Sequence, residues 1–431
     1  MKTKFEAIKN NKLVINSAIL FFGSMMVNVL NYLYHLIMGR ALGPADYGTL
    51  AALISIIGIV SVFGGALSLA ITKFAASTKA EKNKGKAKYL FLRTSKIVFF
   101  IGLFLFLIFA LFSGLITDFL KIDSVYLVLL VGVIFIVAYL PIVSKGITMG
   151  WQRFKALSLI NFLEAFIKLV AAIALVYAGF RVFGAIAAFI ISIGCGYIFS
   201  LYPIKDILYS KKGEIEGLRK NGIIFAIPSL LLSLSIILFY NADIILVKHF
   251  LSGEEAGFYS ALSTIGRIIF FAAGPVSLVV FPTVAEKYSQ NKKTEKYLFQ
   301  GVFLVLVIAA TALIFYFLIP NFVVLMLYGG EYLKISGLLG AAGLSATFLA
   351  LNNLIGYYYL SLEKKWFLIV FWLANISQII LIMLFHQIIV QIIYIQLFVM
   401  IGLFLGLVVY HFRKFFLNYG KRENINYYPG I

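Results

Sequence analysis

Residues 42–53 read LGPADYGTLAAL, and residues 251–262 read LSGEEAGFYSAL. The two stretches align at a constant offset of 209 residues, which places Gly48 opposite Gly257. The same offset also pairs Asp46 with Glu255, Gly65 with Gly274, Ser68 with Ser277 and Leu69 with Leu278. Each stretch joins two long apolar segments, so the sequence is predicted to contain two related halves.

The segments around these turns have the length and composition of membrane helices. Of the 431 residues, 62% are hydrophobic and 13% are charged, whereas soluble domains carry about 25% charged residues. A membrane helix needs roughly 20 mostly apolar residues. Twelve stretches qualify: 14–38, 48–72, 97–117, 125–147, 156–178, 184–204, 222–247, 257–281, 298–319, 335–360, 366–387 and 389–410. The fold class predicted is therefore an all-α, polytopic membrane protein with about 12 transmembrane helices.

Several chemistries have no sequence signature here. One Cys and four His are typical of neither a disulfide framework nor a metal cluster. No P-loop for a nucleoside triphosphate is present, and no Asp-x-Asp motif is available for a sugar nucleotide. We therefore expect no catalytic residues, no metal and no cofactor, and we expect that the protein is not an enzyme.

The excess of basic residues reports topology. There are 37 Lys and Arg against 17 Asp and Glu, and most of the basic residues lie in alternate connections such as 79–96 and 205–221. Cytoplasmic loops of membrane proteins are enriched in Lys and Arg. This bias predicts that both termini are cytoplasmic in a multi-pass protein of the cell membrane. Basic loops would contact anionic membrane lipids, and no nucleic-acid partner is indicated.

The repeat and the even number of spans predict the domain organisation. Each half would contain six helices and would start and end on the cytoplasmic side, so the repeats are parallel. We expect an N-terminal lobe at residues 1–210 and a C-terminal lobe at residues 211–431. Lobes related by an axis along the membrane normal commonly enclose a central site near the bilayer midplane.

Polar residues inside the spans mark the predicted cavity, because such groups are costly in lipid. At 100° per residue they form stripes on individual helices. The candidate substrate-binding residues are Asn28, Asn31, His35, Arg40, Glu164, Lys168, Tyr240, Asp243 and Arg267.

Structural roles for the same residues remain open. Glu164 and Lys168 have the i,i+4 spacing of an intrahelical ion pair, and Arg267 has Asp243 or Glu164 as alternative partners. Asn28 and Asn31 could join neighbouring helices through hydrogen bonds. His35 lies near the outer end of its span, where an interfacial histidine is common.

The turn sequences carry a family resemblance. The stretches GRALGPADYG at residues 39–48, NADIIL at residues 241–246 and GFYSA at residues 257–261 resemble the polysaccharide-transport branch of the multidrug/oligosaccharidyl-lipid/polysaccharide (MOP) flippase superfamily, which includes the O-antigen and exopolysaccharide flippases. The resemblance covers nearly the whole chain in span number and repeat. It implies a flippase that moves a polyprenyl-(pyro)phosphate-linked oligosaccharide across the cytoplasmic membrane by alternating access, for cell-surface polysaccharide or glycan assembly.

The residue pattern suggests roles within that activity. Lys168 and Arg267 would neutralise phosphates, with Arg40 near the outer mouth. Asn28, Asn31, Glu164 and Tyr240 would hydrogen-bond sugar hydroxyls. Expected partners are the lipid-linked oligosaccharide itself, membrane lipids, and polysaccharide polymerase or ligase enzymes.

Two other functions are compatible with this architecture. The first is a cation-coupled multidrug exporter of the same superfamily, which would often carry a carboxylate in its first helix. Span 14–38 has none, and the charges in the middle of the spans are more basic than acidic, which favours an anionic substrate. The second is a non-transporting scaffold for envelope assembly, for which charges in mid-membrane would serve no purpose.

Overall fold

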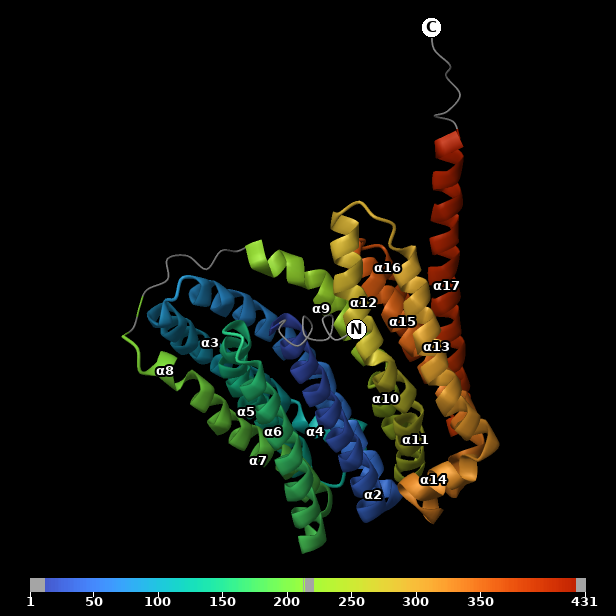
Figure 1. Cartoon of the computed structure of the whole chain (residues 1–431). Helices are drawn as coiled ribbons and strands as arrows, with labels where there is room; N and C mark the ends of the chain where they lie inside the picture. Colours follow the sequence, from blue (N-terminus) through green and yellow to red (C-terminus); the bar gives the residue numbers. More distant parts are fainter. Residues whose placement is uncertain (1–11, 212, 214–220, 424–431) are drawn as a thin grey trace, which may run out of the picture. The chain divides into compact units, whose positions relative to one another are not determined.

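The chain is almost wholly helical. The structure, a computed structural model, describes residues 12–211, 213 and 221–423, and these contain no β-strand (Figure 1). The two chain ends, predicted to be cytoplasmic, and the start of the predicted C-terminal lobe lie partly outside the described residues. The main helices are α2 (Lys12–Ala80), α3 (Lys84–Leu111), α5 (Val125–Gly150), α6 (Phe154–Leu175), α7 (Arg181–Leu201), α8 (Lys205–Leu208), α9 (Asn221–Phe239), α10 (Ala242–Phe250), α11 (Gly253–Gly266), α12 (Ile268–Ser289), α13 (Glu295–Leu318), α14 (Pro320–Tyr328), α15 (Leu339–Ser361), α16 (Phe367–Leu384) and α17 (Ile389–Glu423).

The predicted set of twelve crossings is confirmed. Ten helical stretches of the described chain are long and apolar enough to span a membrane. Two of them are double-length, with 62 residues in Ile19–Ala80 and 55 in Phe154–Leu208, and each therefore accounts for two crossings.

Each double-length stretch is interrupted at a glycine. Gly43 has φ 73° and Gly179 has φ 94°, a region of backbone space that glycine enters without steric cost. Pro44 follows Gly43 directly and has no N–H to donate to the preceding turn. The turn at residues 42–48 is thus the point in α2 at which one membrane crossing ends and the next begins.

Helices extend beyond the apolar stretches that define the spans. The connection predicted at residues 79–96 is much shorter in the structure, because α2 continues to Ala80 and α3 begins at Lys84. The Asn83 side chain accepts a hydrogen bond of 2.9 Å from the Lys86 backbone N–H and caps α3. Hydropathy finds the residues that lie in lipid, whereas a capped helix continues through charged residues into water.

The contacts divide the chain into two compact units. Unit 1 comprises Met1–Ala261 and Val324–Leu333, and unit 2 comprises Leu262–Val323 and Lys334–Ile431. In unit 1, α2 packs against α5, α6, α9 and α10, while α3 packs on α5, and α6 and α5 each pack on α7.

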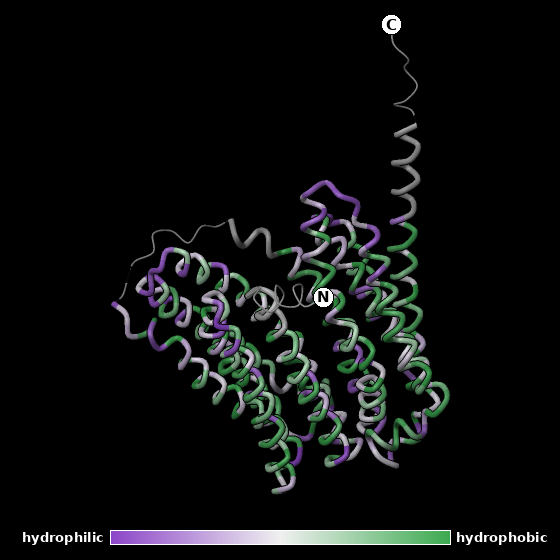
Figure 2. The backbone as a smooth tube through the Cα atoms, in the orientation of Figure 1, coloured by the Kyte–Doolittle hydropathy of each residue, from purple (hydrophilic) through white to green (hydrophobic). Residues whose placement is uncertain are grey.

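In unit 2, α15 is the central helix and contacts α12, α13 and α17. In the most apolar window of its span, 78% of the residues are buried, against 22% for α13, so α13 is predicted to face lipid and α15 to face protein. Asn352 of α15 donates to the Met400 carbonyl at 2.9 Å, and Asn353 donates to Ser277 Oγ at 3.2 Å. Figure 2 shows hydrophobic residues along α13 and hydrophilic ones in the connection between α12 and α13.

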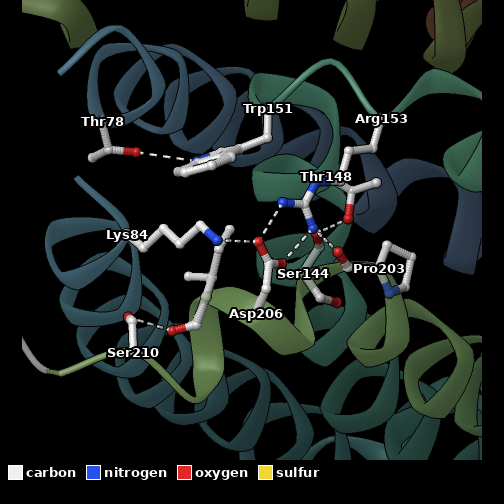
Figure 3. A network of polar contacts seen from close by, with 10 residues as sticks. Thr78, Lys84, Ser144, Thr148, Trp151, Arg153, Pro203, Asp206 and Ser210 are labelled. Atoms are coloured by element: carbon white, nitrogen blue, oxygen red, sulfur yellow. Dashed lines mark hydrogen bonds and ion pairs between the residues drawn. The ribbon is translucent and has the colours of Figure 1, made fainter. Parts of the chain in front are cut away.

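At one end of unit 1, a polar network joins three consecutive basic connections. Arg153 donates two parallel hydrogen bonds to the Asp206 carboxylate, at 2.7 and 2.9 Å, and also donates to the Pro203 carbonyl. The Lys84 ammonium lies 2.9 Å from the same carboxylate. In Figure 3 both cationic groups point at Asp206, and the Trp151 ring N–H points at Thr78.

The intervening connections meet one another as well. Arg181 forms an ion pair of 2.7 Å with Asp46, and the His249 ring contacts the Phe119 carbonyl at 2.7 Å. Alternate connections of unit 1 therefore gather in two separate groups, as predicted for helices that cross a membrane back and forth.

Candidate functional site

A polar cavity lies within unit 1. It has a volume of about 560 Å³ and is enclosed by α2, α6 and α7. Its lining residues are Leu20, Gly23, Ser24, Val27, Asn28, Asn31, Ser61, Ser158, Asn161, Glu164, Ala165, Lys168, Phe189, Ser192 and Ile193. Four of the nine candidates predicted from the sequence, Asn28, Asn31, Glu164 and Lys168, are brought together here.

The helical period explains why these residues share the cavity. Asn28 and Asn31 are three residues apart on α2, and Asn161, Glu164 and Lys168 are three and four apart on α6. Residues at these spacings lie on one face of a helix. Because α2 packs against α6, the two polar stripes face the same space.

Lys168 is the cationic group of the cavity. Its ammonium donates to Asn31 Oδ1 at 2.6 Å. It also lies 5.0 Å from the centre of the Tyr34 ring and 4.6 Å from that of Phe189, within the range of cation–π attraction. An ammonium has three N–H donors, so the hydrogen bond to Asn31 leaves donors for a ligand.

Glu164 does not form the intrahelical pair that its spacing allows. Its carboxylate instead binds the Lys145 ammonium on α5, with an N–O distance of 2.5 Å. Gly196 of α7 faces this carboxylate: a Cβ built there would lie 3.0 Å from Glu164 Cδ and would overlap Oε2. A side chain at position 196 would therefore displace the carboxylate from its present place.

The pairing determines the charge of the cavity. Glu164 and Lys168 are the charged residues among those that line it. Since Lys145 pairs with Glu164, the two lysines and one carboxylate together leave one net positive charge, and Lys168 presents it to the cavity. In a low-dielectric membrane interior, that charge attracts an anion far more strongly than it would in water.

A second cavity of about 400 Å³ lies at the end of unit 1 where Asp46 and Arg181 meet. Its charged lining residues are Asp46, Lys121, Asp123 and Lys248. Since Asp46 is paired with Arg181, which is not among the lining residues, this cavity also has an excess of positive charge. It lies at helix ends and connections, whereas the first cavity lies between membrane-spanning helices and contains four of the candidate residues. The first cavity is therefore the better candidate for the substrate site.

Two candidates lie beside an aromatic cluster and are not among the residues that line the first cavity. His35 Nδ1 is 3.3 Å from the Tyr47 hydroxyl, and that hydroxyl is 2.9 Å from the Tyr328 hydroxyl. Arg40 donates to the carbonyls of Leu325, Met326 and Leu327. These are carbonyls of the last turns of α14, where a cation is favourable.

The remaining candidates occupy other places. Asp243 is fully buried in α10 and accepts a hydrogen bond of 2.6 Å from the Tyr259 hydroxyl. Tyr240 directly follows α9. Arg267 is 9% exposed and lies in unit 2, at the junction of α11 and α12.

Sequence reasoning missed Lys145, Tyr34 and Phe189. Lys145 is near the end of the predicted span 125–147, where its charge suggests the adjacent basic connection, but it lies inside α5, more than a turn before that helix ends at Gly150. Aromatic residues are common in membrane helices, so Tyr34 and Phe189 carried no signal. A lysine within an otherwise apolar span was the one available sign for Lys145.

Comparisons with known proteins identify relatives of the chain. The sequence profile of a family described as polysaccharide biosynthesis protein matches residues 37–337. An uncharacterized membrane protein of Methanocaldococcus jannaschii is 27% identical over 278 residues, which are 59% of this chain and 63% of the relative. The alignment therefore spans less than two thirds of that relative's length.

Solved structures of MOP transporters share the fold. An inward-facing multidrug-resistance transporter of the MATE family, in the MOP superfamily, superimposes with a TM-score of 0.71 at 15% identity, over 91% of this chain and 97% of its own. The lipid II flippase MurJ, in an inward closed conformation, gives 0.69 at 16% identity, over 90% and 86%.

Proposed function

The chain belongs to the polysaccharide biosynthesis protein family, and on that premise we propose that it is a flippase for a polyprenyl-(pyro)phosphate-linked oligosaccharide in the cytoplasmic membrane. The observation that carries the proposal is the unmatched Lys168 ammonium in a polar cavity inside a membrane protein. Phosphate is the anionic part of such a substrate, and hydrogen bonds from a charged donor to phosphate are short and strong.

The lining fits the rest of the headgroup. Asn28, Asn31, Asn161 and several serines supply donors and acceptors for sugar hydroxyls. The Phe189 ring at the cavity wall provides an apolar face for a sugar ring. The polyprenyl chain would stay in the bilayer.

The fold cannot distinguish this proposal from a multidrug exporter, because transporters of both kinds share it. The charge of the cavity can. An exporter of cationic drugs would need an unpaired carboxylate in the cavity. Glu164 is the acidic residue among those lining it, and Lys145 pairs with it.

Structural relatives include an inward-facing and an outward-facing MATE transporter, and we propose that this chain alternates between two such conformations.

The test is mass spectrometry of lipid extracts from a host that lacks this protein. We expect accumulation of a polyprenyl-linked oligosaccharide, whose mass would identify the sugar chain. A plasmid with the wild-type sequence should clear it, and Lys168→Met should not. Lys73→Met, which removes a charge from an exposed position of α2, is the matched control and should clear it. Unchanged lipid-linked sugars with new sensitivity to cationic drugs would instead establish the exporter.

A further inference from the structure

We propose that the Lys145–Glu164 ion pair sets the charge of the unit 1 cavity, so that Lys145 is a specificity-determining residue that never touches the substrate. This rests on the proposed function only for the identity of the anion, a phosphate on a lipid. Lys145 binds the Glu164 carboxylate at 2.5 Å, so that Glu164 has its ion pair with Lys145 and not with Lys168 on its own helix.

Glu164 has a second possible ion-pair partner, Lys168, on its own helix. Glu164 and Lys168 are one turn apart on α6, a spacing at which opposite charges pair readily. If Lys145 were absent, the Glu164 carboxylate would lie half-buried without a counter-ion, and the nearby Lys168 ammonium would satisfy it. The cavity would then carry no net charge toward an anion.

Gly196 is the second residue that determines where the Glu164 carboxylate lies. The Glu164 carboxylate occupies the space that a side chain at position 196 would fill. The atoms that clash are the flexible end of Glu164, so a methyl group there would move the carboxylate while the packing of α7 persists. Gly196→Ala should therefore mimic loss of Lys145 without removing any charge.

The experiment measures binding of farnesyl pyrophosphate, a short polyprenyl pyrophosphate, to the purified full-length protein in nanodiscs. Farnesol serves as the uncharged comparison. We expect the wild type to prefer the pyrophosphate and Lys168→Met to lose that preference. Lys145→Met and Gly196→Ala should each weaken pyrophosphate binding by about tenfold, the loss of one charge-assisted hydrogen bond.

Rescue separates this role from a merely structural one. The double variants Lys145→Met/Glu164→Gln and Gly196→Ala/Glu164→Gln lack the competing carboxylate, so pyrophosphate binding should return in both. Gly194→Ala is the matched control on α7, because no atom lies within 4 Å of its added methyl group. Wild-type affinity in folded Lys145→Met, or failure of Glu164→Gln to restore it, would overturn the proposal.

A gain of function tests the inference independently of the anion. In Lys168→Met the carboxylate remains held by Lys145, and we expect no binding of the cation tetraphenylphosphonium. In Lys145→Met/Lys168→Met the Glu164 charge is released, and this cation should bind. Equal cation binding by the two variants would refute the role of Lys145. A wild type without preference for pyrophosphate over farnesol, combined with this cation gain, would refute only the proposed substrate.

Discussion

Gly48 and Gly257, which are counterparts in the internal repeat, lie against one another in unit 1. A Cβ built at Gly48 would lie 2.6 Å from the Gly257 nitrogen, and one built at Gly257 would overlap the Pro44 carbonyl. Two copies of one turn thus pack backbone to backbone, which requires glycine at both positions.

This contact predicts a stability difference between two glycine variants. Gly257→Ala should destabilise the protein by about 1–3 kcal/mol, because the atoms that clash are backbone and cannot rotate away. Gly65→Ala, with nothing within 4 Å of its added methyl group, should be neutral or stabilising. Thermal unfolding of the purified variants, monitored by size-exclusion chromatography, measures the stability of each. Equal stability of the two would mean that the turns do not pack closely.

Arg40 illustrates how a charge in a turn acquires a structural partner. Its guanidinium donates to the carbonyls of Leu325 and Leu327 in the last turn of α14, where helix carbonyls lack intrahelical N–H donors, although the Leu325 carbonyl also accepts from the Gly329 N–H. We expect Arg40→Met to lower the free energy of unfolding by about 1–2 kcal/mol, because those carbonyls lose charge-assisted hydrogen bonds. Arg40→Lys should recover only part of this loss, since one ammonium cannot reproduce the planar fork of donors. Full stability of Arg40→Met would contradict the role in holding α14.

At the scale of elements, the Asp206 carboxylate ties α8 to α3 and to the connection between α5 and α6. The Arg153–Asp206 pair is bidentate, a geometry that gives an ion pair more than its usual surface value. The Asp206 side chain is 35% exposed, so solvent screens part of the interaction.

We therefore expect Asp206→Asn to destabilise unit 1 by about 1 kcal/mol, after the discount for exposure. Glu81→Gln breaks the single exposed pair with Lys86 and should change stability by less than about 0.5 kcal/mol. The comparison is made by thermal unfolding at low salt and repeated at high salt. A similar loss in both variants would show that the network adds nothing beyond an ordinary surface pair.

At the scale of the whole molecule, the excess of Lys and Arg predicts which end of unit 1 faces the cytoplasm. In a background in which Cys195 is replaced by serine, a single cysteine at Glu81 or Ser210 should react with a membrane-impermeant maleimide only in opened cells. A cysteine at Asp123 or Ser252 should react in intact cells. The reverse pattern would invert the predicted orientation, and labelling of both pairs from one side would contradict the alternation of connections.

The span number, the all-helical class and the family resemblance could all be predicted from sequence. They depend on local quantities: runs of about 20 apolar residues and turn sequences such as residues 39–48. The stripe of Asn28 and Asn31 and that of Asn161, Glu164 and Lys168 also follow from helical period alone. The structure places both stripes in the lining of one cavity, which composition and period could not establish.

Helix ends depend on local capping, which hydropathy does not detect. The Asn83 cap starts α3 at Lys84, so the connection after α2 is shorter than the apolar segments suggest, because both helices continue through charged residues into water.

The sequence by itself determined a membrane protein with twelve membrane-crossing segments and a repeated turn. The length of each apolar segment, the spacing of its polar residues and the Gly-Pro pair in the turn are all local features of the sequence. Only the tertiary structure decided which charges meet. Glu164 has Lys168 one turn away on its own helix, yet it binds Lys145 of α5, across a space that Gly196 of α7 leaves open. The spacing of residues along one helix shows which ion pairs are possible within it. The packing of three helices determines which ion pair forms.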